Sequence, residues 1–244
     1  MTRIIHLDTT PSTNEYANKL LKESTPKDGT VIITDSQTSG RGHDSNIWES
    51  EDKMNLTFSL IYYPNFLPII KQFYLSKCIS IGILNYLNNY SNNVCIKWPN
   101  DIYVGDKKIA GILIENSIQG NSFLNTIIGV GLNINQETFY SDAPNPISLF
   151  QLNNKRYNLK TEFSKLINSI NKYYTKLKNN KYSELDNIYL SNLYRLNKHF
   201  RYKDKDSIFK GKIIGISEFG YLQIETTEKT IKEYDFKEIQ FLDI

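Results

Sequence analysis

The chain has 244 residues, of which 40% are hydrophobic and 13% aromatic, enough for the core of one sizeable domain with a small appendage. Its formal net charge of +3 gives no electrostatic reason to expect nucleic acid as a partner. The two cysteines form no CxxC pair, which excludes an obvious disulfide scaffold or zinc site. No stretch resembles a signal peptide or a bilayer span, which favours a cytoplasmic protein away from membranes.

The first elements in the chain are two short strands with a helix between them. Ile4–Leu7 and Thr30–Asp35 are apolar and predict the strands. Ser12 and Glu15 have the spacing of a capping box, which predicts a helix running to about Glu23. A helix start also offers free backbone N–H groups to a polar or anionic ligand, although this motif caps helices in many proteins.

A polar loop, Ser36–Trp48, follows the second strand and has no hydrophobic period. Gly40 and Gly42 flank Arg41 in it. Glycines let the backbone approach a bound group closely, and a guanidinium can clamp phosphate or carboxylate. The loop matches neither a P-loop nor a dinucleotide fingerprint, and an ordinary surface loop is the alternative interpretation.

The middle of the chain, residues 97–115, reads KWPNDIYVGDKKIAGILIE. A strand over Asn55–Tyr63 and a largely buried helix over Ile69–Asn89 precede it. Val94–Trp98, which leads into this stretch, predicts a short strand that the following proline ends. Gly-Asp at 105–106 is a strong two-residue turn signal, so Ile102–Val104 and Ile109–Glu115 are expected to pair as a hairpin.

Three polar side chains of this hairpin are expected at one rim of a sheet. Asn100, Asp101 and Lys108 project from neighbouring strand ends. An amide, a carboxylate and an ammonium gathered in one place suit an anionic substrate and a metal. The alternative is a surface hairpin with solvated charges, since most lysines are exposed.

The rest of the chain predicts one more strand of the sheet, two helices and a small β-rich tail. Gly129 and Gly131 in the strand Phe123–Asn135 indicate close approach by a ligand or a neighbouring strand; Asn133, at its polar end, is alternatively a turn former. The remaining elements are the amphipathic helices Glu162–Leu177 and Ser183–Leu196, then strands over Ser207–Ile214, Gly220–Thr226, Thr230–Glu233 and Lys237–Leu242. These strands fit a small SH3-like barrel.

Three segments together resemble the biotin–protein ligase family: GRG…W at 40–48, KWPND…KKIAGILIE, and IIGVGLNIN. The helix start at 12–14 fits as well. The resemblance implies an α+β protein, with a mixed-sheet catalytic domain of the class II synthetase-like biotin/lipoate ligase type over 1–195 and a C-terminal SH3-like β-barrel over 196–244. Bifunctional members carry an N-terminal DNA-binding module; this chain resembles the monofunctional class, so we expect no DNA binding.

The resemblance also implies a reaction and its partners. The family joins biotin to ATP, giving biotinyl-5′-AMP, and passes biotin to a specific lysine of biotin carboxyl carrier protein, typically that of acetyl-CoA carboxylase. Two anions meet in the first step, so we assign Lys108 and Arg41 as the catalytic cations. Asn100, Asp101 and Asn133 are expected at the nucleotide, with Mg²⁺ on the ATP phosphates near Asp101 and Asn133.

Biotin itself needs partners for its urea and an apolar slot for the rest. Ser12, Thr13, Asn14 and Gln37 are expected to supply the first, and Trp48 with the strand from Gly111 the second, although Trp48 could simply pack in the core. The full set expected around biotin or biotinyl-AMP is Ser12, Thr13, Asn14, Gln37, Gly40, Arg41, Gly42, His43, Trp48, Lys108 and Gly111.

The loop Gly40–Trp48 is expected to order over the intermediate and exclude water. Better-known bifunctional members have further arginines after GRG, whereas this chain has His43, Asp44, Ser45 and Asn46. We therefore expect weaker retention of the adenylate, or ordering through hydrogen bonds. Two alternative functions are left open, a lipoate–protein ligase and a non-catalytic biotin sensor. Whether the chain forms a homodimer through an exposed sheet edge is left open as well.

Overall fold

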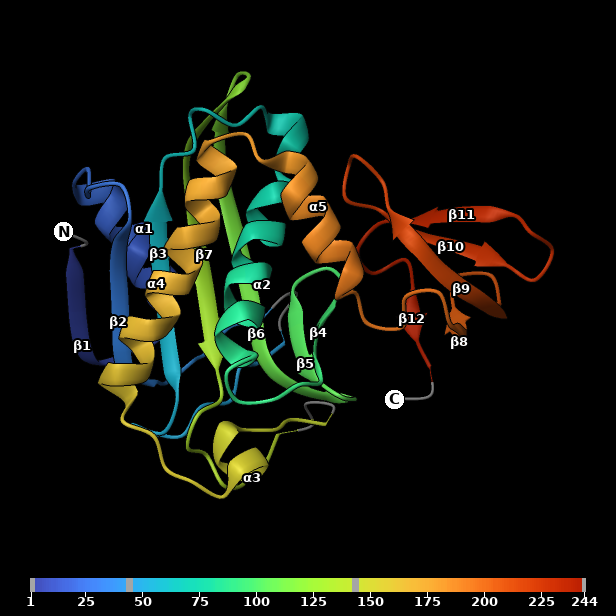
Figure 1. Ribbon diagram of the computed structural model, residues 1–244. Helices are drawn as coiled ribbons and strands as arrows, with labels where there is room; N and C mark the ends of the chain where they lie inside the picture. Colours follow the sequence, from blue (N-terminus) through green and yellow to red (C-terminus); the bar gives the residue numbers. More distant parts are fainter. Residues whose placement is uncertain (1–2, 43–45, 142–144, 243–244) are drawn as a thin grey trace.

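The computed structural model describes residues 3–42, 46–141 and 145–242, and its centre is a seven-stranded mixed sheet (Figure 1). The order across the sheet is β1-β2-β3-β7-β6-β5-β4. β1 runs parallel to β2, and the other neighbours are antiparallel. The strands are β1 (Ile4–Thr10), β2 (Thr30–Gln37), β3 (Leu56–Tyr62), β4 (Val94–Lys97), β5 (Asp101–Val104), β6 (Lys107–Gln119) and β7 (Ser122–Leu132).

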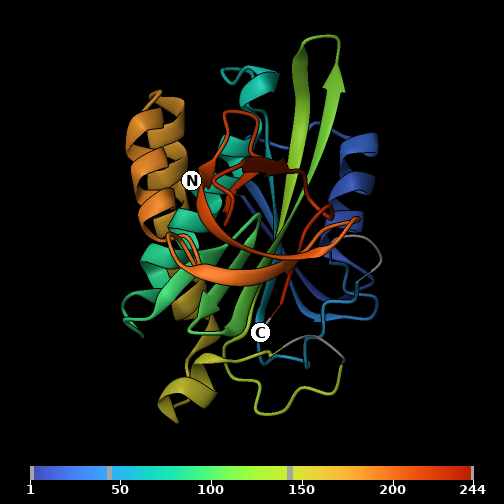
Figure 2. The ribbon, with the colours of Figure 1, turned by 90° about the vertical axis from the view of Figure 1, so that its right-hand side faces the viewer.

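Helices cover both faces of this sheet, as the two views show (Figures 1 and 2). On one face α1 (Thr13–Glu23) packs over a small cluster that includes Ala17, Ile32 and Ile127. On the other face lie α2 (Phe73–Leu87), α4 (Leu159–Lys178) and α5 (Tyr182–Ser191), which enclose the main core. Because both faces are covered, every residue of the interior strand β3 is buried, including the polar Thr57 and Ser59.

The C-terminal strands form a separate antiparallel sheet beside the β4 end of the large one (Figures 1 and 2). It is joined there by the indole of Trp98, whose Nε1 donates to the carbonyl of Gly220 at 2.8 Å. The fold is therefore α+β with a small SH3-like second sheet, as predicted. Its strands, in the order β11-β10-β9-β8-β12, are β8 (His199–Lys203), β9 (Ile208–Ile216), β10 (Leu222–Thr226), β11 (Ile231–Tyr234) and β12 (Gln240–Phe241).

Three details of the predicted elements were wrong. The helix predicted to reach Leu196 ends at Ser191, because the backbone that follows pairs with β4: Ile96 N donates to Asn192 O, and Tyr194 N donates to Ile96 O. The helix predicted from Ile69 begins as a separate 3-10 turn, η2 (Ile69–Lys71). A short helix that the sequence analysis omitted, α3 (Leu149–Asn153), carries a capping box between Ser148 and Gln151.

Within the described ranges, no helix combines the length and apolar character that crossing a bilayer requires. Cys78, which is buried, and Cys95 are both free thiols.

A buried carboxylate links α2 to α4. Glu162 is 3% exposed and accepts hydrogen bonds from Tyr86, Tyr90 and Lys165. Burial by itself raises the pKa of Glu162, but the bonds from Tyr90, Tyr86 and Lys165 outweigh it, and the pKa lies below the ordinary value of 4.5. The ionised carboxylate therefore stabilises the fold above that value, and its contribution is lost as pH falls through the lower folded-state pKa.

Glu162→Gln is accordingly expected to lower the free energy of unfolding by about 1–2 kcal/mol at neutral pH. The difference from wild type should shrink as the pH falls from the ordinary glutamate pKa through the lower folded-state pKa, because the wild-type carboxylate is then protonated first in the unfolded chain and finally in the folded one. Urea unfolding at neutral and acid pH measures both values, with Glu184→Gln, a half-exposed glutamate on α5, as the control. A difference that stays constant with pH would contradict this account.

Candidate functional site

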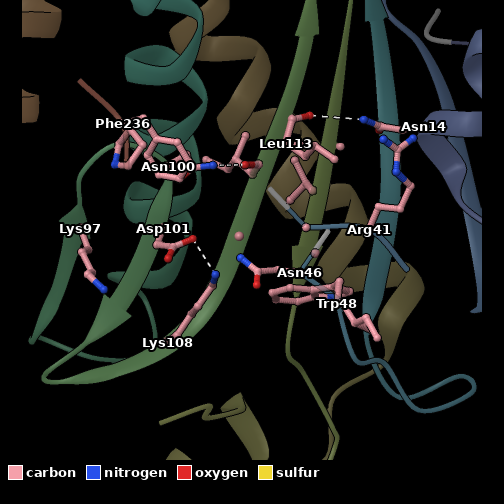
Figure 3. Close-up of a pocket in the computed structure, with 18 of the residues that line it drawn as sticks. Asn14, Arg41, Asn46, Trp48, Lys97, Asn100, Asp101, Lys108, Leu113 and Phe236 are labelled. Carbon is pink, nitrogen blue, oxygen red and sulfur yellow. Dashed lines mark hydrogen bonds and ion pairs between the residues drawn. The ribbon is translucent and has the colours of Figure 1, made fainter. Parts of the chain in front are cut away.

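One cavity of about 490 Å³ lies where α1, the sheet and the C-terminal sheet meet. Its wall includes the start of α1, the end of β2, the loop of Arg41, the ends of β4 to β7 and the last part of the chain (Figure 3). Segments that are far apart in sequence therefore share one hollow. The side chains sort into a hydrogen-bonding group near α1 and a charged group near β5 and β6.

The start of α1 is held by Gln37 of β2 and not by its own capping box. Gln37 Oε1 accepts from the backbone N–H of Thr13 at 2.9 Å and lies 3.3 Å from its hydroxyl. The predicted helix is confirmed, with Ser12 at its N-cap and its last residue at Glu23, but the Ser12 side chain makes no capping bond, so the capping box itself was wrong. Ser12 lines the cavity with its side chain uncommitted to the cap.

Asn14 is fixed from three sides. Its Oδ1 lies 2.6 Å from the Ser59 hydroxyl, and its Nδ2 donates to Glu115 Oε2 at 2.7 Å and more weakly to Leu113 O at 3.5 Å. This geometry needs Gly129 on β7, because a methyl group there would lie 2.5 Å from Asn14 Oδ1. Ser59 and Gly129 are register partners, so the neighbouring strands β3 and β7 together position the Asn14 amide.

Two facing glycines form a floor for Trp48. Gly111 of β6 and Gly131 of β7 are register partners, and a methyl group at Gly131 would lie 2.5 Å from Cζ2 and Nε1 of the Trp48 ring. The ring therefore lies on bare backbone. The Trp48 Nε1 is buried and donates to none of the described residues. It is a hydrogen-bond donor left available inside the site.

The loop before Trp48 is folded back on itself. Trp48 N donates to Gly40 O at 2.9 Å, and Gly42 N donates to Asn46 O at 2.7 Å. A side chain at Gly40 would collide with the Trp48 carbonyl, which explains why glycine stands there. Arg41, between them, reaches Glu115 with its NH2 3.7 Å from Oε1. The loop thus brings a cation to Glu115, the same carboxylate that holds Asn14.

The charged group is centred on Lys108. Its Nζ lies 2.7 Å from Asp101 Oδ1, and both side chains are about one-quarter exposed (Figure 3). A β-bulge between Ile102 and Tyr103 shifts the register of β5 against β6 and so sets this pair. Asn100 donates its Nδ2 to Ile112 O at 2.5 Å, which holds the neighbouring turn against β6.

A second lysine, Lys97, lies on the same wall. Its Nζ donates to the Tyr103 hydroxyl at 3.1 Å and lies 5.2 Å from the Phe241 ring centre. Burial lowers the pKa of Lys97, and the nearby Lys108 and Arg195 act in the same direction, while Asp101 opposes them. Burial also raises the pKa of Tyr103, so this hydroxyl remains protonated as an acceptor for the ammonium.

Most of the predicted site residues meet at this cavity. Those that line it are Ser12, Thr13, Asn14, Gln37, Arg41, Gly42, Trp48, Asn100, Asp101, Lys108 and Gly111. Gly40 and Asn133 do not line it, and His43 lies outside the described residues. Asn133 is 3% exposed; its Nδ2 donates to Ile147 O at 3.1 Å, and its Oδ1 accepts no hydrogen bond from the described residues.

Two parts of the wall were not predicted from the sequence. Lys97 belongs to the KWPND motif that was singled out, so its lysine could have been included. The second part is from the C-terminal sheet and the segment before β12: Phe236, Lys237, Ile239, Gln240 and Phe241. No local pattern in that segment indicates a site. The Phe236 ring packs against Trp98, with ring centres 6.3 Å apart, and this tertiary contact brings the segment to the cavity.

Comparisons with known proteins cover both parts of the fold. Residues 7–133 match the model of the biotin/lipoate A/B protein ligase family. The chain is 28% identical to the bifunctional ligase/repressor BirA of Bacillus subtilis over 237 residues, which are 95% of this chain and 72% of that protein. It is also 33% identical to biotin–protein ligase 2 of Arabidopsis thaliana over 113 residues, 45% of this chain and 34% of that one.

A solved structure extends this similarity over the whole fold. The biotin protein ligase from Aquifex aeolicus in complex with biotin and ATP is similar with a TM-score of 0.81 at 26% identity, covering 98% of each chain. The family match contains the α1 start, the Arg41 loop and the Lys108 hairpin, whereas the structural match also includes the C-terminal sheet.

Proposed function

This chain belongs to the biotin/lipoate A/B protein ligase family, and we propose that it is a biotin–protein ligase that activates biotin with ATP and transfers it to a carrier-protein lysine. One observation carries the proposal. A single cavity holds the hydrogen-bonding residues near the start of α1, here called the polar cluster (Ser12, Thr13, Asn14 and Gln37). Trp48, which packs on the two facing glycines, lies beside this cluster, and the Lys108–Asp101 pair lies in another part of the same cavity. The first part suits a neutral urea on an apolar tail, and the second suits phosphate.

In the first step a biotin carboxylate oxygen attacks the α-phosphorus of ATP, the bond to the β-phosphate oxygen breaks, and pyrophosphate leaves. Both reactants are anions, so fixed positive charge must lie between them. Lys108 is held at 2.7 Å by Asp101, which orients its ammonium toward the cavity. Arg41, beside Glu115, is the second cation and can move from that carboxylate to a phosphate oxygen.

Magnesium, when bound on the ATP phosphates, would neutralise part of their charge. Asp101 offers a carboxylate on the cavity wall, and the buried Asn133 Oδ1 is an acceptor that no described residue uses. Both are oxygen donors of the kind Mg²⁺ prefers, so the residues fit the ion. Asn133 is not part of the cavity wall, and we therefore propose Asp101 as the nearer donor.

In the second step the amine of the carrier lysine attacks the acyl carbonyl of biotinyl-5′-AMP and AMP leaves, giving an amide. The adenylate must be kept from water until then. The described loop residues 41–42 and 46–48 line the same cavity as Asn14, so the loop is suited to that task. The acceptor that we propose is a specific lysine of biotin carboxyl carrier protein.

A substitution at Glu115 tests whether the polar cluster binds biotin. Its carboxylate joins Asn14 at 2.7 Å to Arg41 at 3.7 Å. Glu115→Gln keeps the shape but removes the charge that strengthens the bond from Asn14, so biotin affinity is expected to fall about three- to tenfold. Calorimetric titration with biotin measures this, with Glu137→Gln as the control because Glu137 is half-exposed and pairs with Arg156. Unchanged biotin affinity in Glu115→Gln would remove Asn14 from the proposed urea site.

Pyrophosphate release in the absence of carrier tests the proposed reaction. The purified chain is mixed with MgATP and either biotin or lipoate. We expect about one equivalent of pyrophosphate per active site with biotin, followed by slow turnover as the adenylate hydrolyses. A burst only with lipoate would make the protein a lipoate–protein ligase. Tight biotin binding with no burst would make it a non-catalytic sensor.

A further inference from the structure

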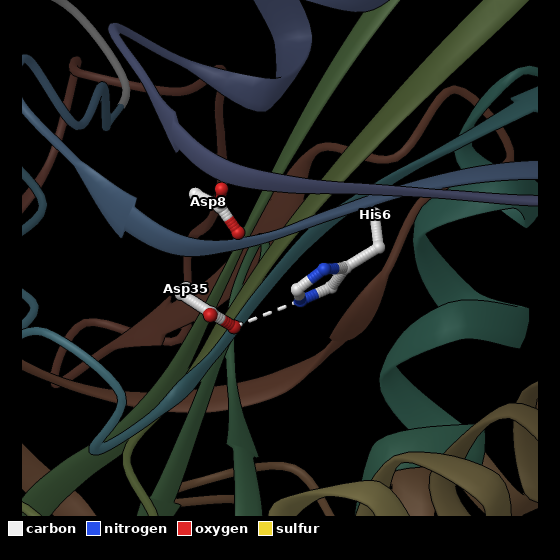
Figure 4. Close-up of side chains that lie close together, drawn as sticks. All are labelled: His6, Asp8 and Asp35. Carbon is white, nitrogen blue, oxygen red and sulfur yellow. Dashed lines mark hydrogen bonds and ion pairs between the residues drawn. The ribbon is translucent and has the colours of Figure 1, made fainter.

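Outside the cavity, three metal-ligating side chains gather on one surface of the sheet (Figure 4). His6 and Asp8 lie two residues apart on β1 and therefore point to the same side of the strand. Asp35 lies on the neighbouring β2, where its Oδ1 is 2.8 Å from His6 Nε2. One nitrogen and two carboxylate oxygens of these residues all lie within 4.8 Å of one another.

We propose that His6, Asp8 and Asp35 form a binding site for one divalent transition-metal ion of the Zn²⁺ or Co²⁺ type. An imidazole with two carboxylates is a ligand set that suits such ions, whereas Mg²⁺ and Ca²⁺ prefer oxygen ligands alone. Two ligands bound about 2.1 Å from one ion lie at most about 4.2 Å apart. Small rotations of the exposed side chains would close the remaining gap.

The charges of the cluster favour a cation. Asp8 and Asp35 are on adjacent parallel strands, since Leu7 is the register partner of Thr34 and Thr9 that of Ser36. Two carboxylates placed side by side across a strand pair repel each other. The His6 hydrogen bond engages only one oxygen of Asp35. A divalent ion would neutralise both carboxylates, and the exposed side of the cluster would leave coordination positions to water.

Because of where the cluster lies, a bound ion would hold the edge strand β1 against β2. β1 is an edge strand, bonded within the sheet only to β2. Both strands run from the cluster directly into the cavity: Thr10 and Gln37 are register partners at their ends, and Gln37 holds the start of α1. An ion between β1 and β2 would therefore fasten the edge strand that leads to the polar cluster. This inference does not depend on the proposed ligase reaction.

Titration of the whole chain with Co²⁺, without ATP, tests the site through the visible d–d absorption of the bound ion. The protein is first treated with EDTA and then desalted. We expect saturable binding of one ion per chain, and a rise in the melting temperature when Zn²⁺ is added in excess, because an ion that binds only the folded state stabilises it. His6→Ala and Asp8→Asn should each weaken binding by tenfold or more and abolish the rise.

The other two histidines of the chain supply the controls. His199→Ala, which changes an exposed residue of β8, and His43→Ala should bind Co²⁺ as the wild type does. Melting of each variant in EDTA shows that it is folded, and Asp8→Asn keeps the site testable if His6→Ala is unstable. No saturable binding up to millimolar Co²⁺ would overturn the proposal, as would binding that survives His6→Ala or disappears in His43→Ala.

Discussion

Lys108→Ala is expected to slow formation of biotinyl-5′-AMP by about 10²–10³-fold, the usual effect of removing one group that stabilises transition-state charge. The reason is that Lys108 is the ammonium that Asp101 orients into the cavity, where two anions must approach each other. Its loss should reduce the single-turnover rate of pyrophosphate release far more than it reduces biotin affinity. Rapid-quench measurement with saturating biotin and MgATP gives that rate.

The control for this experiment is the neighbouring residue. Lys107 precedes Lys108 on β6, is exposed, and does not line the cavity. Lys107→Ala changes the net charge by the same amount but should leave the rate within twofold of wild type. If both variants slowed the reaction equally, the effect would be one of overall charge, and Lys108 would lose its catalytic assignment.

Gly131→Ala is the second substitution with a large expected effect, and it acts on biotin binding. The added methyl group would lie 2.5 Å from two atoms of the Trp48 ring, which must then leave its seat on the glycine floor. Because Trp48 is the proposed apolar wall of the biotin slot, we expect biotin affinity to fall by tenfold or more, about 1.4 kcal/mol. Titration calorimetry measures the affinity.

A glycine in the second sheet provides the matched control. At Gly215 of β9 a methyl group would meet only the end of the flexible Gln223 side chain, at 3.1 Å. Gly215→Ala should therefore bind biotin normally. The melting temperature of Gly131→Ala should remain close to that of the wild type, because the displaced residue belongs to a surface loop. Normal biotin affinity in Gly131→Ala would show that the Trp48 seat is no part of the biotin slot.

The parts of the fold that the sequence predicted are those with a local signal. The Gly105-Asp106 turn and the apolar runs beside it specified the β5–β6 hairpin, and the structure confirms it. β8 was missed because only two apolar residues, Phe200 and Tyr202, alternate along it, and so short a pattern does not mark a strand by itself. Its place is set by backbone pairing with β9 and β12, which is not visible in its own residues.

The residues of the candidate site also divide into those with a local sequence signal and those placed by tertiary packing. Residues within the motifs, such as Lys108 and Asn14, were predicted to lie together and do line one cavity. The wall made by Phe236 and Phe241 depends on how the second sheet packs against Trp98, a contact between segments more than 100 residues apart, as the Trp98–Gly220 bond shows. Asn133 was expected at the nucleotide from its position in a motif, yet its amide is committed to the Ile147 carbonyl.

The central claim is that the chain transfers biotin to a protein lysine, and the mass of the acceptor tests it most directly. A purified biotin carboxyl carrier domain is incubated with MgATP, biotin or lipoate, and either the wild-type chain or Lys108→Ala. The account predicts that the carrier gains the mass of one biotinyl group with the wild type, and does so far more slowly with the variant. A carrier that gains no mass with biotin, or gains mass only with lipoate, would contradict it.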